Sequence, residues 1–416
     1  MGRRSKGIRV ERLLLLIVIV VAVIAGVFFG ISKTVNKISG DDTSSSKEKE
    51  EEKVIPPDIT LNMTVTGDVL CHNTQYFDAY IPSEDTYDFS YMFDDVKKYF
   101  DAGDICVGTM ETTFAGKDVG YSNYPTFNSP DELARDLKEL GYDVMATATN
   151  HCLDKGIKGL FRTIEVLHNN GIENYGTYLT KEDSEKILIK DVKGIKIAFL
   201  TFDYGTNGIP IPEGYEYAIS MIDKTKMEAD IKKAREEGAE IIAVNMHWGE
   251  EYREQPTQEQ KDLADFLFKN GVDLILGSHT HCLEPMEKRT VTLDDGTTKD
   301  GFVVYSLGNF MSGQNHENSR QSVILDIQIT KHGEDGKFTI DSVKYTPIYM
   351  YNIYNGKALQ AFKVMDIREE MRKYEAGEST IGATLYNTLQ SELAHVEKVM
   401  GPDIISEQTQ EQKVEE

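Results

Sequence analysis

The stretch Leu61-Asn-Met-Thr-Val-Thr-Gly-Asp68 decides the fold of this 416-residue chain. Its apolar and polar residues alternate with the period of a β-strand, and a carboxylate follows directly where the pattern stops. Other apolar runs also end in polar clusters, and together these clusters contain four of the nine histidines. The clusters are Gly67-Asp68, Glu111, Asn150-His151 with Asp154, His247-Trp248-Gly249, Gly277-Ser278-His279-Thr280-His281 and Ser306-Leu307-Gly308-Asn309-Phe310. Because strand-end loops meet at the carboxyl edge of an open α/β sheet, the clusters predict a single metal site.

Strands and helices alternate over most of the chain. A first strand begins near residue 59 and runs into Gly67-Asp68. The other predicted strands are 105–110, 144–148, 195–202, 241–246, 274–276, 302–307, 322–330 and 338–346. The predicted helices are 91–102, 131–140, 157–169, 224–236 and 258–270. This rhythm predicts an α/β fold with a layered sheet, flanked by helices on both faces, and with the last two strands as antiparallel additions.

The N-terminal residues predict a membrane anchor. Residues 13–31 form an apolar run that nearly matches a hydrocarbon core of about 30 Å. Residues 1–12 are basic, so the positive-inside bias predicts a cytoplasmic N-terminus and a single-pass cell-membrane protein with an extracellular C-terminal domain. The alternative is a cleaved signal peptide, although the apolar region of such a peptide usually has only about 7–15 residues. Residues 32–57 are predicted to be a flexible charged linker.

Composition limits the other features of the chain. The predicted folded domain covers residues 58–375, followed by a helical segment over 376–401 and an acidic disordered tail over 402–416. The net charge of −24 argues against nucleic acid as a partner. Four cysteines are too few for a disulfide scaffold. Cys71, Cys152 and Cys282 lie beside the polar clusters. Three roles are open for them: metal ligands, a disulfide, or small apolar residues that fill the core.

The clusters contain the mixed oxygen and nitrogen donors that manganese, iron and zinc accept. The candidate ligands are Asp68, Glu111, Asn150, His247, His279 and His281. His279 and His281 give the clearest signal, because alternate residues of an extended segment share a face. Each residue alone also has a structural explanation: Asp68 as turn chemistry, His247 as core packing, His151 as a cap or core residue.

Six motifs carry a family resemblance. They are Thr66-Gly67-Asp68, Met110-Glu111-Thr112, Asn150-His151-x-x-Asp154-x-Gly156, His247-Trp248-Gly249-x-x-Tyr252, Gly277-x-His279-x-His281 and Tyr305-Ser306-Leu307-Gly308-Asn309-Phe310. In this order, the region from Leu61 to Phe310 resembles the bacterial CapA family. That family is similar in fold to calcineurin-like metallophosphoesterases. It is associated with poly-γ-glutamate capsule synthesis or export, usually as membrane-anchored extracellular proteins.

The resemblance implies a role for each matched residue. Asp68 and His281 would bind one divalent ion, Glu111 would bridge, and Asn150, His247 and His279 would hold a second ion. His151 would be the proton donor to the leaving group and Asp154 would orient it. Trp248, Tyr252 and Asn309 would line or organise the substrate pocket.

Two departures from the wider pattern concern the first metal. Where metallophosphoesterases often have Asp-x-His, this chain has Leu70 two residues after Asp68, and the nearest histidine is His72. Where the capsule family often has Asn-Leu-Glu, this chain has Thr109-Met110-Glu111. One ligand of the first metal is therefore missing or displaced.

Three functions follow from these expectations. The first is an extracellular dinuclear metallohydrolase acting on a phosphate ester or a polymer bond. The second is a non-catalytic partner of polymer synthase or export subunits that binds poly-γ-glutamate. The third is a secreted nucleotidase-like hydrolase unrelated to capsule.

Overall fold

The computed structural model describes residues 55–293, 296–355 and 358–406, and these residues belong to one compact unit. The predicted anchor over 13–31 and nearly all of the predicted linker over 32–57 lie outside the described residues. None of the described helices is long and apolar enough to cross a membrane.

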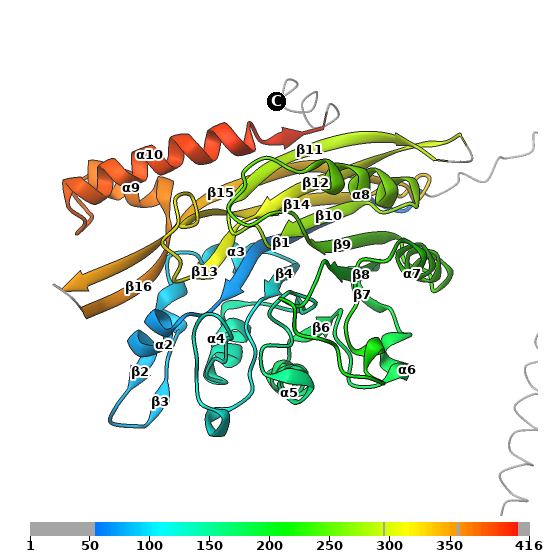
Figure 1. Ribbon diagram of the computed structural model, residues 1–416. Coiled ribbons are helices and arrows are strands. Elements are labelled where there is room, and N and C mark those ends of the chain that lie inside the picture. The colour runs from blue at the N-terminus through cyan, green and yellow to red at the C-terminus, as the bar shows by residue number, and fades with distance from the viewer. Residues whose placement is uncertain (1–54, 294–295, 356–357, 407–416) are drawn as a thin grey trace, which may run out of the picture. The chain divides into compact units, whose positions relative to one another are not determined.

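Two mixed sheets form the centre of the folded unit (Figure 1). One has nine strands: β16 (Ala358–Asp366), β15 (Phe338–Asn355), β14 (Gln321–Lys331), β1 (Ile59–Leu70), β4 (Ile105–Met110), β5 (Val144–Ala146) and β6 (Glu173–Tyr175) in order, with β13 (Asn309–Ser312) on β1 and β17 (Ile404–Ile405) on β15. The other has six strands in the order β11 (Leu283–Thr292), β12 (Thr298–Leu307), β10 (Leu274–Ser278), β9 (Ile241–His247), β8 (Ile195–Asp203) and β7 (Leu188–Val192). A small hairpin joins β2 (Tyr80–Ile81) to β3 (Thr86–Tyr87).

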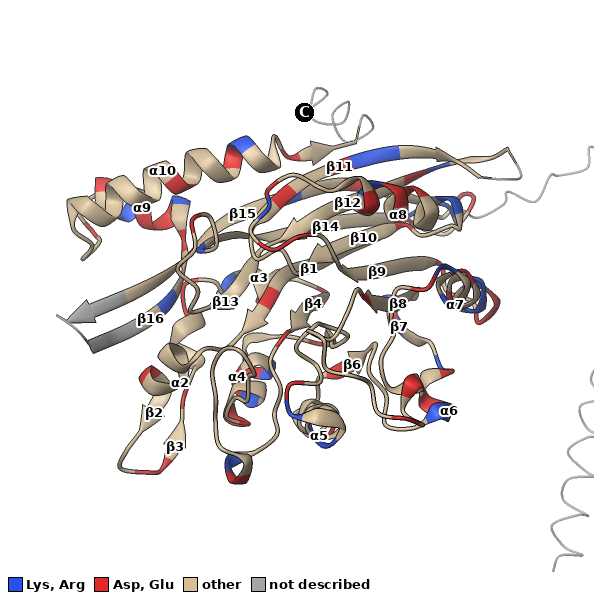
Figure 2. Ribbon diagram, in the orientation of Figure 1, with Lys and Arg blue, Asp and Glu red and all other residues tan. Residues whose placement is uncertain are grey.

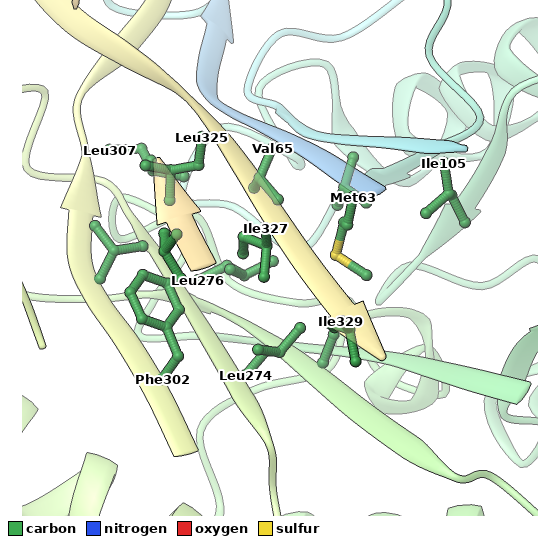
Figure 3. Packing of buried hydrophobic residues seen from close by; sticks show 14 of the residues in the cluster. Met63, Val65, Ile105, Leu274, Leu276, Phe302, Leu307, Leu325, Ile327 and Ile329 are labelled. Carbon is green, nitrogen blue, oxygen red and sulfur yellow. The ribbon is translucent and has the colours of Figure 1, made fainter. Parts of the chain in front are cut away.

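The largest core lies between the two sheets (Figure 3). Met63 and Val65 of β1 are fully buried there, and Leu274, Leu276 and Phe302 meet them from the six-stranded sheet. The mixed α/β class is therefore confirmed, but the predicted single sheet with helices on both faces is wrong. An alternating pattern of apolar residues indicates only that one face of a strand is buried. A second sheet can bury that face just as a helix can.

Helices surround the two sheets. They are α2 (Asn73–Ala79), α3 (Lys97–Ala102), α4 (Glu132–Leu140), α5 (Gly156–Asn169), α6 (Lys181–Ser184), α7 (Lys224–Glu236), α8 (Gln258–Lys269), α9 (Ile367–Glu375) and α10 (Ala383–Met400), with 3-10 turns at Ser90–Phe93, Lys117–Val119 and Glu216–Ala218. The helix α4 packs on the nine-stranded sheet through Leu133 and Leu137. The helices α7 and α8 pack on the six-stranded sheet. Figure 2 shows both signs of charge interspersed along α7, as expected for a helix with only a narrow buried face.

Several predicted elements differ from the structure in extent. The helix expected over 91–102 is split into a 3-10 turn and α3. The hairpin partner β11 and the strands β13 and β16 were not predicted, because their residues carry no clean alternation. The tail was expected from residue 402, but Ile404 and Ile405 pair with Val343 and Ser342 of β15; residues 407–416 lie outside the described residues.

The chain passes from one sheet to the other at Gly308. The strand β12 ends at Leu307 in the six-stranded sheet, and β13 begins at Asn309 beside β1 in the nine-stranded sheet. The Asp68 amide donates to the Gly308 carbonyl at 3.0 Å. A Cβ on Gly67 would lie 1.9 Å from that carbonyl oxygen, so only glycine permits the crossing.

We therefore expect Gly67→Ala to lower the free energy of unfolding by about 2–3 kcal/mol, because the added methyl must push the Gly308 backbone away. Denaturant titration of the purified protein measures the change. The matched control is Gly382→Ala, whose added Cβ meets no atom within 4 Å and should stay within about 0.5 kcal/mol of the parent. Equal stability of both variants would contradict the close-approach argument.

Candidate metal centre

The predicted ligands come together at the carboxyl ends of the parallel strands. Asp68 lies near the end of β1, Glu111 directly follows β4, and His247 ends β9. Asn150 follows β5, and the loop after β10 carries His279 and His281. All six side chains are buried, with at most 2% of their surface exposed. Segments from both sheets thus contribute to one polar cluster.

The cluster divides into two groups that share Glu111. One consists of Glu111, His247 and His279, and the other of Asp68, Glu111 and His281; in each group one ligand atom per residue lies within 4.8 Å of the others. The Glu111 Oε1 atom lies 3.5 Å from the His247 Nε2 atom, and Oε2 lies 3.7 Å from the His281 Nδ1 atom. The two oxygens of one carboxylate therefore face different histidines, which is the arrangement of a bridging ligand.

Asn150 extends the first group. Its Oδ1 atom lies 3.0 Å from the His247 Nε2 atom. The other ring nitrogen of His247, Nδ1, lies 2.9 Å from the Ser278 hydroxyl. Contacts of this kind set the ring orientation of a ligating histidine, so Nε2 is the nitrogen that faces the centre.

Several polar atoms of the centre lack hydrogen-bond partners. Asp68 Oδ1, both carboxylate oxygens of Glu111 and His279 Nδ1 are buried without one. An unpaired buried polar atom costs on the order of 1–3 kcal/mol, more for a charged one. Atoms of this type, converging from two carboxylates and several imidazoles, fit a divalent cation.

Burial keeps these groups neutral in the absence of a cation. It raises the pKa of Glu111 to about 8, with the charges of Glu251 and Asp154 adding to it and that of His151 opposing. It also raises the pKa of Asp68, to which the Glu111 charge contributes, and lowers the pKa values of His247, His279 and His281. A bound cation would reverse the preference of the carboxylates for the neutral form, because it stabilises their negative charge. The neutral imidazoles would donate electron pairs to it.

His151 and Asp154 form an ion pair beside the cluster. The His151 Nδ1 atom lies 2.8 Å from the Asp154 Oδ2 atom, which also accepts from the Phe127 amide at 2.7 Å. Burial by itself would lower the pKa of His151, but the Asp154 hydrogen bond and the charges of Glu111 and Asp154 outweigh it and raise that pKa. The geometry suits a histidine held in one orientation with Nε2 directed away from Asp154.

The sequence predicted that the segment carrying His279 and His281 is extended, and this prediction is wrong. Both residues have left-handed backbone conformations, with φ of 92° and 59°. The two side chains therefore do not share a face but reach different groups on either side of Glu111. The His279 amide also donates to Asp68 Oδ2 at 3.1 Å, which ties the loop to β1.

Two of the three predicted pocket residues have other roles. Trp248 is 1% exposed, packs against Tyr305 and donates to its carbonyl at 2.8 Å, so it belongs to the core and offers no face to a substrate. Asn309 is fully buried, and its Oδ1 atom lies 3.0 Å from His281 Nδ1. It contacts the ring nitrogen of His281 that faces Glu111 and does not line an open pocket. Tyr252 is partly exposed near His281 and stacks on His316 at 3.8 Å between ring centroids.

Neither the cysteines nor His72 join the centre. All four cysteines are free and buried, which favours the filler interpretation. The His72 Nδ1 atom lies 2.8 Å from the Leu70 carbonyl oxygen, and burial lowers the pKa of His72 to about 4. Within the described part of the chain, His72 is absent from both ligand groups, so it does not replace the missing Asp-x-His histidine.

Sequence reasoning missed the loop after β8. Tyr204 is 45% exposed, and its ring lies 4.3 Å from that of His279. Asn207 contacts both Asn150 and His151. Asp203 is fully buried, and neither of its carboxylate oxygens has a hydrogen-bond partner. The signal was available, because Asp203-Tyr204-Gly205 follows an apolar strand just as the recognised clusters do.

Fold and site together define a mixed α/β protein with a buried candidate centre for divalent metal ions. The model of the family described as bacterial capsule synthesis protein PGA_cap matches residues 62–314, and the chain belongs to this family.

Two curated relatives are similar over much of the chain. The capsule biosynthesis protein CapA of Bacillus anthracis is 27% identical over 284 residues, covering 66% of this chain and 65% of that protein. The PGA biosynthesis protein CapA of Bacillus subtilis is 28% identical over 264 residues, covering 61% and 64%. The matched region thus spans slightly less than two thirds of each relative.

Among solved structures, the NAD nucleotidase of Haemophilus influenzae has a TM-score of 0.45 at 13% identity, covering 82% of this chain and 61% of that one. A 5'-nucleotidase precursor of Thermus thermophilus has a TM-score of 0.42 at 15% identity, covering 82% and 59%.

The raised pKa of Glu111 predicts how the stability of the metal-free protein depends on pH. Between its ordinary pKa of 4.5 and the folded value of about 8, the folded state holds a proton that the unfolded chain has lost. The contribution of Glu111 to stability therefore falls by on the order of 3 kcal/mol as the pH rises from 5 to 8, while His247, His279 and His281, whose pKa values are lowered, contribute in the opposite direction. Urea unfolding with a chelator at both pH values measures it, and Glu111→Gln should remove this part of the dependence. An identical pH dependence in the variant would contradict the burial argument.

Proposed function

We propose that this chain is a membrane-anchored, extracellular CapA-type protein that acts in poly-γ-glutamate capsule biosynthesis or export. We further propose that its predicted domain over 58–375 has a calcineurin-like metallophosphoesterase fold with a dinuclear hydrolytic centre. Family membership supports the capsule role. The apolar run over 13–31 and the basic residues before it support the anchor and the extracellular placement.

The observation that carries the hydrolytic proposal is the shared carboxylate. Glu111 lies between two ligand groups and directs one oxygen to each. Two-metal hydrolytic sites hold their ions about 3.5–4 Å apart, a spacing that a bridging carboxylate supports. Asp68, Glu111 and His281 would hold the first ion, and Glu111, Asn150, His247 and His279 the second. The mixed donors favour manganese, iron or zinc over calcium.

The chemistry follows from the chain's own residues. Two bound divalent ions would supply an activated water and charge neutralisation at the scissile group. His151 is suited to protonate the leaving oxygen as its bond breaks, because Asp154 holds Nδ1 and stabilises the charged ring. Tyr204 and Tyr252 flank the two groups and would contact the substrate.

A phosphate ester is the simplest substrate of such a centre, and a bond in the capsule polymer is the other. The net charge of −24 repels poly-γ-glutamate unless cations bridge the two. Polymer synthase or export subunits would then share in holding the polymer near the domain. The acidity also argues against a nucleic-acid partner.

One observation favours a second candidate, a non-catalytic assembly subunit. Among the described residues, the first ion would have three ligands of the His, Cys, Asp or Glu type, because Leu70 occupies the position of the histidine in Asp-x-His and His72 contacts the Leu70 carbonyl. A domain with one weak metal position retains a binding surface even where hydrolysis is lost. A secreted nucleotidase-like hydrolase unrelated to capsule would use the same ligands. Its substrates would distinguish it from the capsule hydrolase and from the assembly subunit.

Metal analysis tests the centre directly. We expect the purified full-length chain to bind two equivalents of Mn²⁺ per chain, and His281→Ala and His279→Ala each to lose one, because each histidine belongs to a different group. Elemental analysis after dialysis measures the content. The matched control is His168→Ala, an exposed histidine of α5 that should keep both equivalents. No metal in the parent protein would reject the dinuclear centre.

Hydrolysis tests the chemistry. With Mn²⁺, the full-length chain should cleave an activated phosphodiester, and Asn150→Ala and His151→Ala should each reduce kcat about 100-fold or more, since one removes a ligand and the other the proton donor. Release of nitrophenolate measures the rate, with His168→Ala as the unaffected control.

The two candidate functions differ in a capsule-forming host. A strain deleted for the gene should regain capsule with the parent gene but not with a His151→Ala, His281→Ala version if hydrolysis is required. Full rescue by the double variant, together with no phosphodiester cleavage by the parent protein, would favour the assembly subunit.

A further inference from the structure

The side-chain amide of Asn150 has two different ends, and its orientation is fixed by its neighbours. Its Oδ1 atom lies 3.0 Å from the His247 Nε2 atom, inside the candidate centre. Its Nδ2 atom donates to the Asn207 Oδ1 atom at 3.2 Å and to the Tyr204 hydroxyl at 3.4 Å. Only the oxygen end can bind a divalent cation, since the amide nitrogen has no free electron pair to offer. The acceptors on the nitrogen side therefore decide whether Asn150 can be a ligand.

Asn207 also lies against the face of His151. Its Nδ2 atom is 3.4 Å from both ring nitrogens of that histidine, so it sits over the ring and leaves the in-plane Asp154 contact of 2.8 Å undisturbed. Asn207 has a left-handed backbone with φ of 51°, which asparagine tolerates better than most residues. The Ile209 amide donates to the Thr206 carbonyl at 2.9 Å and closes the turn around it.

We propose that Asn207 is the positioning residue that aims the Asn150 oxygen at the second metal position, through its own side-chain oxygen on the Asn150 amide nitrogen. The inference rests on the proposed metal centre. In this arrangement the turn after β8 supports the ligand Asn150 from outside the centre. The Tyr204 hydroxyl is a second, more distant acceptor for the Asn150 amide nitrogen. Outer contacts of this kind typically change metal affinity by about 10–100-fold.

Two substitutions test the role of the Asn207 side-chain oxygen separately from that of the rest of the side chain. Asn207→Gly removes the acceptor and keeps the left-handed backbone free of strain. Asn207→Asp keeps an oxygen for the Asn150 amide nitrogen and replaces only the amide that faces His151. We expect Asn207→Gly to weaken one of the two Mn²⁺ equivalents by about tenfold or more, the same equivalent that His279→Ala removes. Asn207→Asp should bind at least as tightly as the parent.

Calorimetric titration of the metal-free full-length chain with MnCl₂ measures both affinities, and thermal unfolding without metal checks that each variant is folded. Two parent-like affinities in a folded Asn207→Gly variant would overturn this inference and leave the dinuclear proposal standing. A tenfold loss in Asn207→Asp would also overturn it, because the acceptor is still present; this outcome decides the question even if the glycine variant does not fold. A parent protein that binds no Mn²⁺ would overturn both proposals.

Discussion

The crossing of the chain at Gly308 is the constraint on which the centre depends. The strand β12 belongs to one sheet and β13 to the other, so the two sheets are covalently joined within a single residue. The backbone of Gly308 can approach β1 only because Gly67 has no side chain. This approach puts Asp68 of one sheet next to the loop of the other, where the His279 amide donates to the carboxylate. Ligands from two sheets can meet only where the sheets are held this closely.

Burial gives the centre its chemistry and also its cost. Asp68 and Glu111 are fully buried, and Asp68 Oδ1 and both oxygens of Glu111 lack the hydrogen bonds that normally compensate for desolvation. Such a cluster is tolerated because an extensive apolar core lies between the sheets and supplies the stability that the polar edge does not. The same desolvation that raises the pKa values of the carboxylates makes a divalent cation a favourable replacement for their protons.

Local sequence patterns predicted many of the strands and helices and identified the loops that carry the candidate ligands. The helix expected over 224–236 is α7 to the residue, because its cap at Asp223 and its narrow apolar face are local features. The second sheet was not predictable in the same way, since strand periodicity does not identify what covers a face. The role given to Trp248 failed for a similar reason: an aromatic residue beside a ligand can equally point into the core. Asn207 was missed because its part in the site exists only through contacts with a distant loop.

The two halves of the centre are unequally supported, and this asymmetry bears on the choice between catalysis and assembly. On the side of His247 and His279, Asn150 adds a further donor, Ser278 orients one ring, and the turn after β8 holds the amide. On the side of Asp68 and His281, Asn309 Oδ1 contacts the same Nδ1 atom of His281 that faces Glu111, and no further His, Cys, Asp or Glu side chain joins the group among the residues that the structure describes. Metal affinity depends on ligand number and on outer contacts, so the second position should fill at lower metal concentrations than the first. The concentration of available metal would then determine whether the domain holds one ion, sufficient for a binding surface, or the two that hydrolysis by this mechanism requires.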